Sequence, residues 1–299
     1  MEVIHNIAII FISIFLESLP FLILGSLISA IIETFVSNDT LAKLIPKNKV
    51  LGSIVGVFLG FFLPACDCAV IPVSKRLLKK KVPINVAVSF MLASPIINPV
   101  VLLSTYYAFF RTNPSIFWYR LIFGIVIALV IGIIMGIIFG YKEVITNNSD
   151  ECDEECMCHM HHHQGKNKFV EIFKHTGLDL FEVVKFLMFG AMIASIVQVL
   201  IPRNILAMFN SNDFLSIIVL CLFAYLISLC STSDSFVGKS LLSSFSKSSI
   251  LAYLLLGPMI DIKNTIVLFG NYKKSFVITL ICLIFVTVII SSLVVARFI

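Results

Sequence analysis

The chain has 299 residues, of which 59% are hydrophobic and 13% are charged, and its formal net charge is +5. Soluble domains contain about 45–50% apolar and about 25% charged residues, so this composition excludes an ordinary soluble protein and predicts an integral membrane protein. The positive charges are spread over many loops and do not suggest a nucleic-acid partner.

Long apolar runs recur along the chain. A helix needs about 20 apolar residues to cross a hydrocarbon core of ~30 Å. Eight runs approach this length, at about residues 7–35, 50–66, 84–109, 117–141, 178–201, 213–230, 248–269 and 275–298. The expected fold is therefore all-α, with about eight transmembrane helices. No basic residue precedes the first run, so no cleavable signal peptide is expected.

The second apolar run carries small residues at regular spacing. Gly52, Gly56 and Gly60 recur every fourth residue, which places them on one face of a helix. Such a smooth stripe predicts close packing against a neighbouring helix.

The stretch Leu63–Lys81, LPACDCAVIPVSKRLLKKK, is polar and rich in breaks within a very apolar chain. Pro64 lacks a backbone donor and disfavours helix in the residue before it, and Pro72 predicts a second break. Irregular backbone at membrane depth survives only where protein or a water-filled cavity surrounds it. Ala65–Val70 is therefore expected to be an unwound segment that lines a cavity.

Two thiols and an acid lie in this stretch. In an unwound turn, Cys66 and Cys68 can both point at one soft ion, and the charge of Asp67 should face the protein interior. In the alternative interpretation, both cysteines are small packing residues and Asp67 only pairs with Lys75 or Arg76.

A polar loop separates residues 1–141 from residues 177–299 and covers about residues 142–176. It holds thiols and imidazoles that suit zinc, copper or nickel: Cys152, Cys156, Cys158, His159, His161, His162 and His163. Their spacing fits no standard zinc finger. We interpret the segment as a flexible chelating or sensing loop. The alternative is an acidic linker that binds metal only opportunistically.

The two apolar halves resemble each other, which predicts an internal repeat. Glu17 aligns with Glu182 and Asn98 with Asp261, and Leu229–Lys247 looks like a weaker copy of the broken stretch. Many secondary transporters place a midplane site between repeated halves that carry broken helices at corresponding positions. Parallel and inverted arrangements of the repeats both stay open.

Within the copy, Cys230 aligns with Cys66, and Asp234 follows four residues later. If the two breaks face each other, Cys66, Cys68 and Cys230 would form a three-thiolate site for a thiophilic trivalent species or a soft metal. The alternative is that Cys230 is an ordinary core residue.

Ionisable groups inside predicted spans are candidates for solute binding or proton transfer. Glu17 and Glu182 are candidate proton-coupling residues, and Asn98 and Asp261 are candidate substrate-binding residues. Lys263 would, in the alternative interpretation, simply neutralise Asp261. The cations at span ends, Arg120 and Arg297 among them, are counted with the loops.

Three segments, PACDCAVIPVSKRLLKK, FMLASPIINPVVLLSTY and CSTSDSFVGKSLL, resemble the predicted-permease family that includes the YraQ-like proteins and the ArsP organoarsenical efflux permeases. The resemblance covers nearly the whole chain. It implies an inner-membrane permease with about eight spans. For the ArsP members it implies export of trivalent organoarsenicals through membrane-embedded cysteines. The Cys/His loop lies outside the family's signatures and leaves a transition metal open as the solute.

The leading hypothesis is a proton-coupled secondary exporter in the plasma membrane that needs no cofactor and is not an enzyme. Its substrate-binding candidates are Cys66, Asp67, Cys68, Asn98, Cys230, Asp234 and Asp261. The expected partners are the lipid bilayer and a small thiophilic solute or metal ion, and a homo-oligomer stays open. The alternatives are a transition-metal permease, a membrane thiol redox protein that uses Cys66 and Cys68, and a permease subunit driven by a separate partner.

Overall fold

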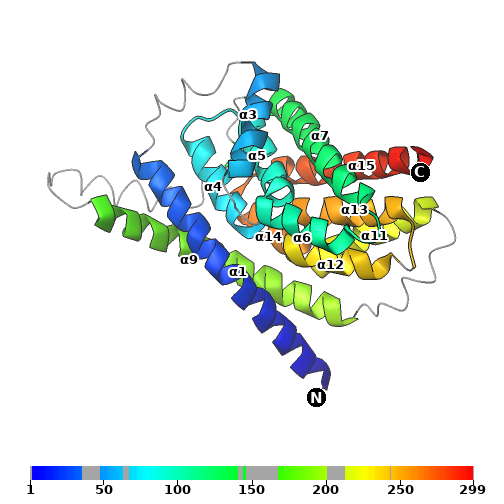
Figure 1. Cartoon of the computed structure of the whole chain (residues 1–299). Coiled ribbons are helices and arrows are strands. Elements are labelled where there is room, and N and C mark those ends of the chain that lie inside the picture. Colours follow the sequence, from blue (N-terminus) through cyan, green and yellow to red (C-terminus); the bar gives the residue numbers. More distant parts are fainter. Residues whose placement is uncertain are drawn as a thin grey trace.

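A computed structural model describes residues 2–35, 48–62, 67–140, 144–145, 168–200, 213–242 and 244–298, and it is helical almost throughout (Figure 1). In chain order the helices are α1 (Glu2–Phe35), α3 (Lys49–Phe62), α4 (Asp67–Lys79), α5 (Ile84–Ile97), α6 (Pro99–Phe109), α7 (Ser115–Ile138), α9 (Lys168–Leu200), α11 (Asp213–Ile227), α12 (Ser231–Leu241), α13 (Lys247–Met259), α14 (Ile262–Asn271) and α15 (Lys274–Phe298). An isolated antiparallel bridge joins Ile145 to Tyr272.

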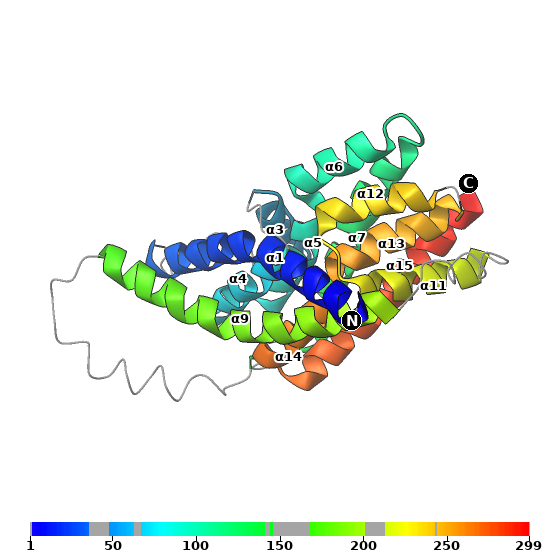
Figure 2. The same cartoon turned by 90° about the horizontal axis from the view of Figure 1, so that it is seen from below.

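Two helices, α5 and α13, form the centre of the helical body. Every residue of α5 is buried, and in α13 the residues from Ser248 to Met259 are buried. A helix that is apolar on all sides is expected only in such an interior. Helix α5 contacts α3, α7 and α13, while α13 contacts α11 and α15. Helices α1 and α9 pack against each other and lie along one side of this body (Figure 2).

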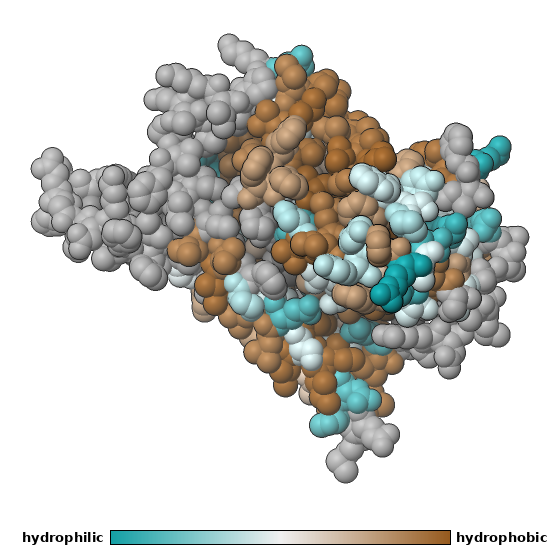
Figure 3. Space-filling model, viewed as in Figure 1, coloured by the Kyte–Doolittle hydropathy of each residue, from teal (hydrophilic) through white to brown (hydrophobic). Residues whose placement is uncertain are grey.

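Among the described residues, five segments are long and apolar enough to cross a membrane: Val3–Leu24, Ile84–Phe109, Ser115–Ile138, Lys247–Asn271 and Lys274–Arg297. They coincide with five of the eight predicted runs. Shorter apolar helices occupy the positions of the other three, at Lys49–Phe62, Val183–Val199 and Asp213–Ile227. The span in α7 is only 39% buried, and large apolar side chains such as Val126 and Ile137 are exposed on it. This apolar surface, seen over α3 and α7 in Figure 3, suits contact with lipid.

Two of these spans are broken in the middle. Asn98 separates α5 from α6 in an extended conformation, which the following Pro99 favours. Ile260 and Asp261 separate α13 from α14, and both are extended. Each break therefore exposes the N-terminus of a short helix inside the protein.

The glycine stripe of α3 packs against α5 as predicted. A Cβ atom on Gly52 would lie 2.7 Å from the Asn85 Nδ2 atom, and one on Gly60 would lie 2.9 Å from a backbone nitrogen of α5. A Cβ atom on Gly56 would overlap the carbonyl oxygen of Val86. The close approach of the two backbones therefore depends on the missing side chains.

Gly56→Ala is expected to lower the free energy of unfolding by about 1–3 kcal/mol, because a backbone carbonyl cannot move aside as a flexible side chain would. The thermal unfolding of the purified protein in detergent measures this effect. Gly177→Ala is the matched control, since the helical Gly177 of α9 is exposed and its Cβ would meet nothing within 4 Å. Equal unfolding temperatures for the two variants would contradict the packing argument.

The proline-broken stretch is helical from Asp67 onward, so the prediction of an unwound Ala65–Val70 with a second break at Pro72 is wrong there. Helix α4 runs through Pro72 to Lys79. Pro72 is only the sixth residue of the helix, so it removes a single intrahelical bond beyond the first turn, where donors are unpaired anyway. Burial of the following turn offsets this loss.

The second half begins earlier than the sequence predicts. Helix α9 starts at Lys168, within the range 142–176 expected to be a loop. The metal-binding prediction for residues 152–163 concerns positions outside the described residues.

Candidate functional site

The break between α11 and α12 is the best-described part of the predicted site. Ser228, Leu229 and Cys230 are not helical, and Ser228 has a φ of 52°, which residues with a Cβ adopt rarely. Cys230 occupies the N-cap position of α12 with φ −71° and ψ 143°. Its thiol is half-buried and lies 3.4 Å from the Thr232 hydroxyl. Cys230 is therefore partly exposed at a point where the backbone is not helical.

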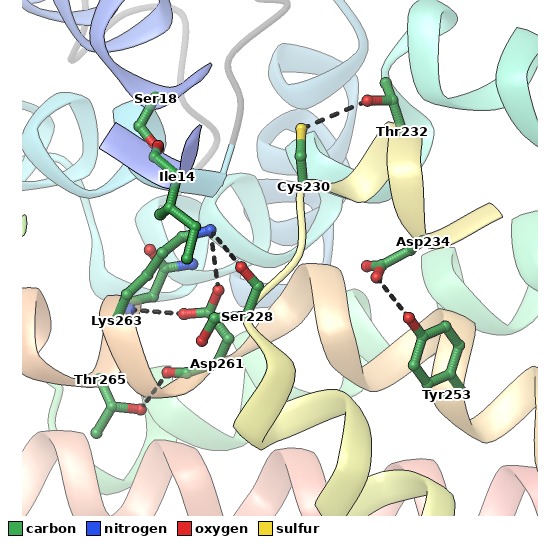
Figure 4. Close-up of polar contacts among 11 residues, drawn as sticks. Ile14, Ser18, Ser228, Cys230, Thr232, Asp234, Tyr253, Asp261, Lys263 and Thr265 are labelled. Atoms are coloured by element: carbon green, nitrogen blue, oxygen red, sulfur yellow. Dashed lines mark hydrogen bonds and ion pairs between the residues drawn. The ribbon is translucent and has the colours of Figure 1, made fainter. Parts of the chain in front are cut away.

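A buried ion pair lies beside this break, as Figure 4 shows. The Lys263 ammonium is 3.2 Å from Asp261 Oδ2, and it also donates to the carbonyl oxygen of Ser228 at 3.3 Å. Both charged side chains are almost fully buried. Neutralisation of Asp261 by Lys263, one of the two interpretations of the sequence, is therefore seen in the structure.

Asp261 also caps a helix. Its Oδ1 atom accepts a hydrogen bond from the Asn264 backbone at 2.6 Å, at the start of α14. Asn98 does the same for α6, where its Oδ1 atom accepts from the Val100 backbone at 3.0 Å. The two residues that align in sequence thus have the same role at the two breaks.

Asp234 lies on the other side of the break, in α12, and is 2% exposed (Figure 4). Its Oδ1 atom accepts a hydrogen bond from the Tyr253 hydroxyl at 2.9 Å. A Cβ atom on Gly257 would lie 2.8 Å from the Asp234 Oδ2 atom, so a glycine is needed where α13 passes this carboxylate. The side chain of Asp234 is therefore fixed where α12 packs against α13.

Arg120 is the charged partner that sequence reasoning missed. It is fully buried in α7 and interacts electrostatically with Asp234. Its guanidinium donates to the hydroxyls of Thr105 at 2.6 Å and Ser235 at 2.8 Å, and to the Ser231 carbonyl at 3.4 Å. Arg120 thus joins α7 to α6 and to the start of α12. It lies near the end of the α7 span as predicted, but it is buried, so counting it with a loop is wrong. The available signal was its position as the one charged residue of an apolar helix.

The C-terminal half of α4 contacts the end of α14. Lys75 is buried and donates to the Asn271 side chain at 3.0 Å, and the hydroxyls of Ser74 and Tyr272 share a hydrogen bond of 2.7 Å. Burial raises the pKa of the Tyr272 phenol, which keeps it neutral in this contact. These bonds fix α4 against the second half of the chain.

The other predicted site residues are exposed, or they lie wholly or with their side chains outside the described part of the chain. Glu17 is exposed on α1, away from the buried pairs. Glu182 lies in α9, and Asp67 and Cys68 lie in the first turn of α4, with side chains outside the described part of the chain. Cys66 falls outside the described residues altogether. Among the described residues, no three His, Cys, Asp or Glu side chains are grouped closely enough to hold a metal ion.

The described site combines the half-buried thiol of Cys230 with the buried ion pair of Asp261 and Lys263. Beside it, the buried Arg120 and Asp234 interact electrostatically. A single thiol can bind a soft, trivalent or thiophilic species. Ionisable groups inside membrane spans are functional candidates by default, because their burial is costly.

The chain matches known proteins over nearly its whole length. The model of a family described as "Predicted permease" matches residues 3–297. A protein of Bacillus subtilis strain 168, named UPF0718 protein YcgR, is 39% identical over 286 residues, which cover 96% of this chain and 95% of the relative. A protein of Streptococcus mutans serotype c is 36% identical over 272 residues, 90% of this chain and 88% of the relative, and is named as a proposed subunit of a two-component membrane permease complex.

No solved structure matches the chain. The family match and the apolar helices make this a multi-pass protein of the plasma membrane, and they indicate a transporter rather than an enzyme. The resemblance noted in the sequence is thereby confirmed: the chain belongs to the ArsP_1 family of predicted permeases.

Proposed function

We propose that the protein is a proton-coupled secondary exporter of a thiophilic solute, such as a trivalent organoarsenical. The observation that carries this proposal is the half-buried thiol of Cys230 at the N-cap of α12, directly after a break in the backbone. A thiophilic solute needs a sulfur ligand that it can reach from a cavity, and broken helices provide such positions in transporters.

The proposal includes eight spans in two repeated halves. The order of helices supports it: α1, α3, α4, α5, α6 and α7 are followed by α9, α11, α12, α13, α14 and α15, with long and short helices in the same sequence. The contacts support it as well, since α6 packs on α12 and α14 packs on α4. In this arrangement Cys66 corresponds to Cys230, so both breaks contribute a thiol, and Cys68 adds a third.

The acids and amide of the two halves complete the proposed site. Asn98 and Asp261 would orient the solute at the two helix breaks, and Asp67 and Asp234 would balance its charge near the thiols. Glu17 and Glu182 would pass protons along α1 and α9. These roles rest on the position of each residue in its helix and on the cost of placing ionisable groups in spans.

A growth assay tests this function. Cells that express the wild-type protein should resist methylarsenite and phenylarsenite, whereas Cys66→Ser or Cys230→Ser should remove that resistance at equal expression. The matched controls are Cys221→Ser and Cys282→Ser, because these thiols lie in α11 and α15 away from the breaks. Unchanged resistance in the Cys66→Ser and Cys230→Ser cells would disprove the thiol site.

The same cells distinguish the rival solutes. Resistance to zinc, copper or nickel that needs residues 152–163 would move the substrate to transition metals. A reversible disulfide between Cys66 and Cys68, with no resistance to any of these species, would favour a redox role.

A second candidate is a permease that works with another subunit. The name of the Streptococcus mutans relative favours it, since that protein is described as one part of a two-component complex. Purification of this chain with a stoichiometric membrane or ATPase subunit, required for resistance, would establish this arrangement. Resistance conferred by this chain alone in a foreign host would exclude it.

A further inference from the structure

Lys263 lies where a lysine is unfavourable for local structure. It is in the first turn of α14, two residues after the cap residue Asp261, and it is 2% exposed. The positive end of a helix dipole repels a cation there, and burial of an ammonium inside a membrane is unfavourable. At the matching position of α6, two residues after Asn98, the chain has the exposed Val100. A helix break of this type therefore forms without a lysine.

The surroundings of Lys263 are tightly packed. A Cβ atom on Gly190 of α9 would lie 2.8 Å from the Lys263 Cα atom, so α9 covers the first turn of α14 at this point. The lysine cannot reach the lipid surface without displacing that helix. Its ammonium is thus directed to oxygen atoms of the protein interior.

Those oxygen atoms form the kind of set that binds a hard monovalent cation. The ammonium is 3.2 Å from Asp261 Oδ2 and 3.3 Å from the main-chain oxygen of Ser228. The Ser228 hydroxyl, in the same residue, is buried and has no hydrogen-bond partner in the described part of the chain. Carboxylates and carbonyl oxygens of unwound segments coordinate Na⁺ in transporters whose helices are broken.

Ser228 is held in an unusual conformation at this place. Its φ of 52° is rare for a residue with a Cβ atom and is strained. Ser228 immediately follows α11 and lies two residues before Cys230. The lysine thus connects the start of α14 to the segment that carries the half-buried thiol.

We propose that Lys263 is a tethered cation that occupies the position of a soluble coupling cation, and that it makes the protein independent of Na⁺. The inference rests on the proposed function, because it assigns the ion specificity of a secondary transporter to one residue. Without the ammonium, Asp261 and Ser228 would form a net negative, oxygen-lined site open to Na⁺.

Thermal unfolding of the purified full-length protein tests whether Lys263 replaces a bound Na⁺. The measurement is made in two salts of equal ionic strength, NaCl and choline chloride, at about 0.15 M. NaCl should raise the unfolding temperature of Lys263→Ala by about 3 °C or more relative to choline chloride, because an ion that binds only the folded state stabilises it. The wild-type protein and Lys263→Arg should unfold at the same temperature in both salts. Lys185→Ala, an exposed lysine of α9, is the matched control.

The double variant Lys263→Ala/Asp261→Asn should fold without a response to Na⁺, since it lacks the carboxylate. Three results would overturn the proposal: no Na⁺ response in Lys263→Ala, failure of that variant to fold in either salt, or a Na⁺ response in the wild type. A Na⁺ response without arsenical export would keep the cation site and remove the proposed substrate. Export by the wild type without a Na⁺ response in Lys263→Ala would remove the tethered cation alone.

Discussion

Asp261→Ala is expected to cause the largest loss of stability of any single substitution considered for this protein. It removes the cap of α14, which is worth about 1 kcal/mol, and it leaves the buried ammonium of Lys263 without its counter-ion, which costs about 3–5 kcal/mol. Denaturant unfolding in detergent, or the yield of monodisperse protein where unfolding is irreversible, measures the combined effect.

Asn98→Ala provides the matched control. Asn98 also caps its helix, α6, but Val100 stands where α14 has Lys263, so the loss of Asn98 should cost only about 1 kcal/mol. The difference between the two variants isolates the contribution of the ion pair. Similar losses for both would show that the pair between Asp261 and Lys263 contributes little to stability.

Asp234→Asn is the second large prediction. The amide can still accept the hydrogen bond from Tyr253, but the guanidinium of Arg120 would stay buried without a negative charge. Because Arg120 keeps its hydrogen bonds to Thr105, Ser235 and the Ser231 carbonyl, we expect a loss of about 1–3 kcal/mol. The shift in unfolding midpoint measures this cost, and transport should be lost together with it because α12 is no longer held in place.

A double-mutant cycle tests whether the stability lost in Asp234→Asn comes from its interaction with Arg120. Arg120→Met combined with Asp234→Asn removes both charges, so the double variant should be more stable than the sum of the two single losses predicts. The hydroxyls of Thr105 and Ser235 would lose their donor in both Arg120 variants alike. Strictly additive losses would mean that Arg120 and Asp234 do not interact.

The sequence predicted the parts of the fold that depend on local patterns. Five spans lie where the apolar runs predict them. The glycines of α3 were recognised from their spacing alone, because every fourth residue shares a helix face whatever the neighbour is. The equivalence of Asn98 and Asp261 was also visible, since both precede a helix at aligned positions.

The predictions from sequence were wrong at positions where tertiary contacts decide the backbone conformation or the burial of a side chain. Proline statistics favoured a break at Pro72, but the packing of α4 maintains the helix through it. Arg120 looked like a charge of a loop, because its burial follows only from α6 and α12 closing over α7. The hydrogen bond between Asp234 and Tyr253 joins residues 19 positions apart on two different helices, so no local sequence pattern predicts it.

Two buried cations, Lys263 and Arg120, help a membrane protein to keep a non-helical segment. The segment Ser228–Cys230 is not helical, and Lys263 binds its first carbonyl oxygen, while the Cys230 carbonyl accepts from the Asp234 backbone N–H. Arg120 binds the carbonyl oxygen of Ser231 just beyond the segment. Backbone groups that are freed at membrane depth must find such partners. The thiol of Cys230 is thus presented on a segment that is fixed at both ends.

The most direct test of this account is the uptake of methylarsenite into everted membrane vesicles that contain wild-type, Cys230→Ser or Cys221→Ser protein. With a proton gradient applied, wild-type and Cys221→Ser vesicles should accumulate the arsenical, and Cys230→Ser should reduce the rate by about tenfold or more through loss of a soft ligand. Uptake by Cys230→Ser vesicles at the wild-type rate would contradict the claim that this thiol binds the transported solute.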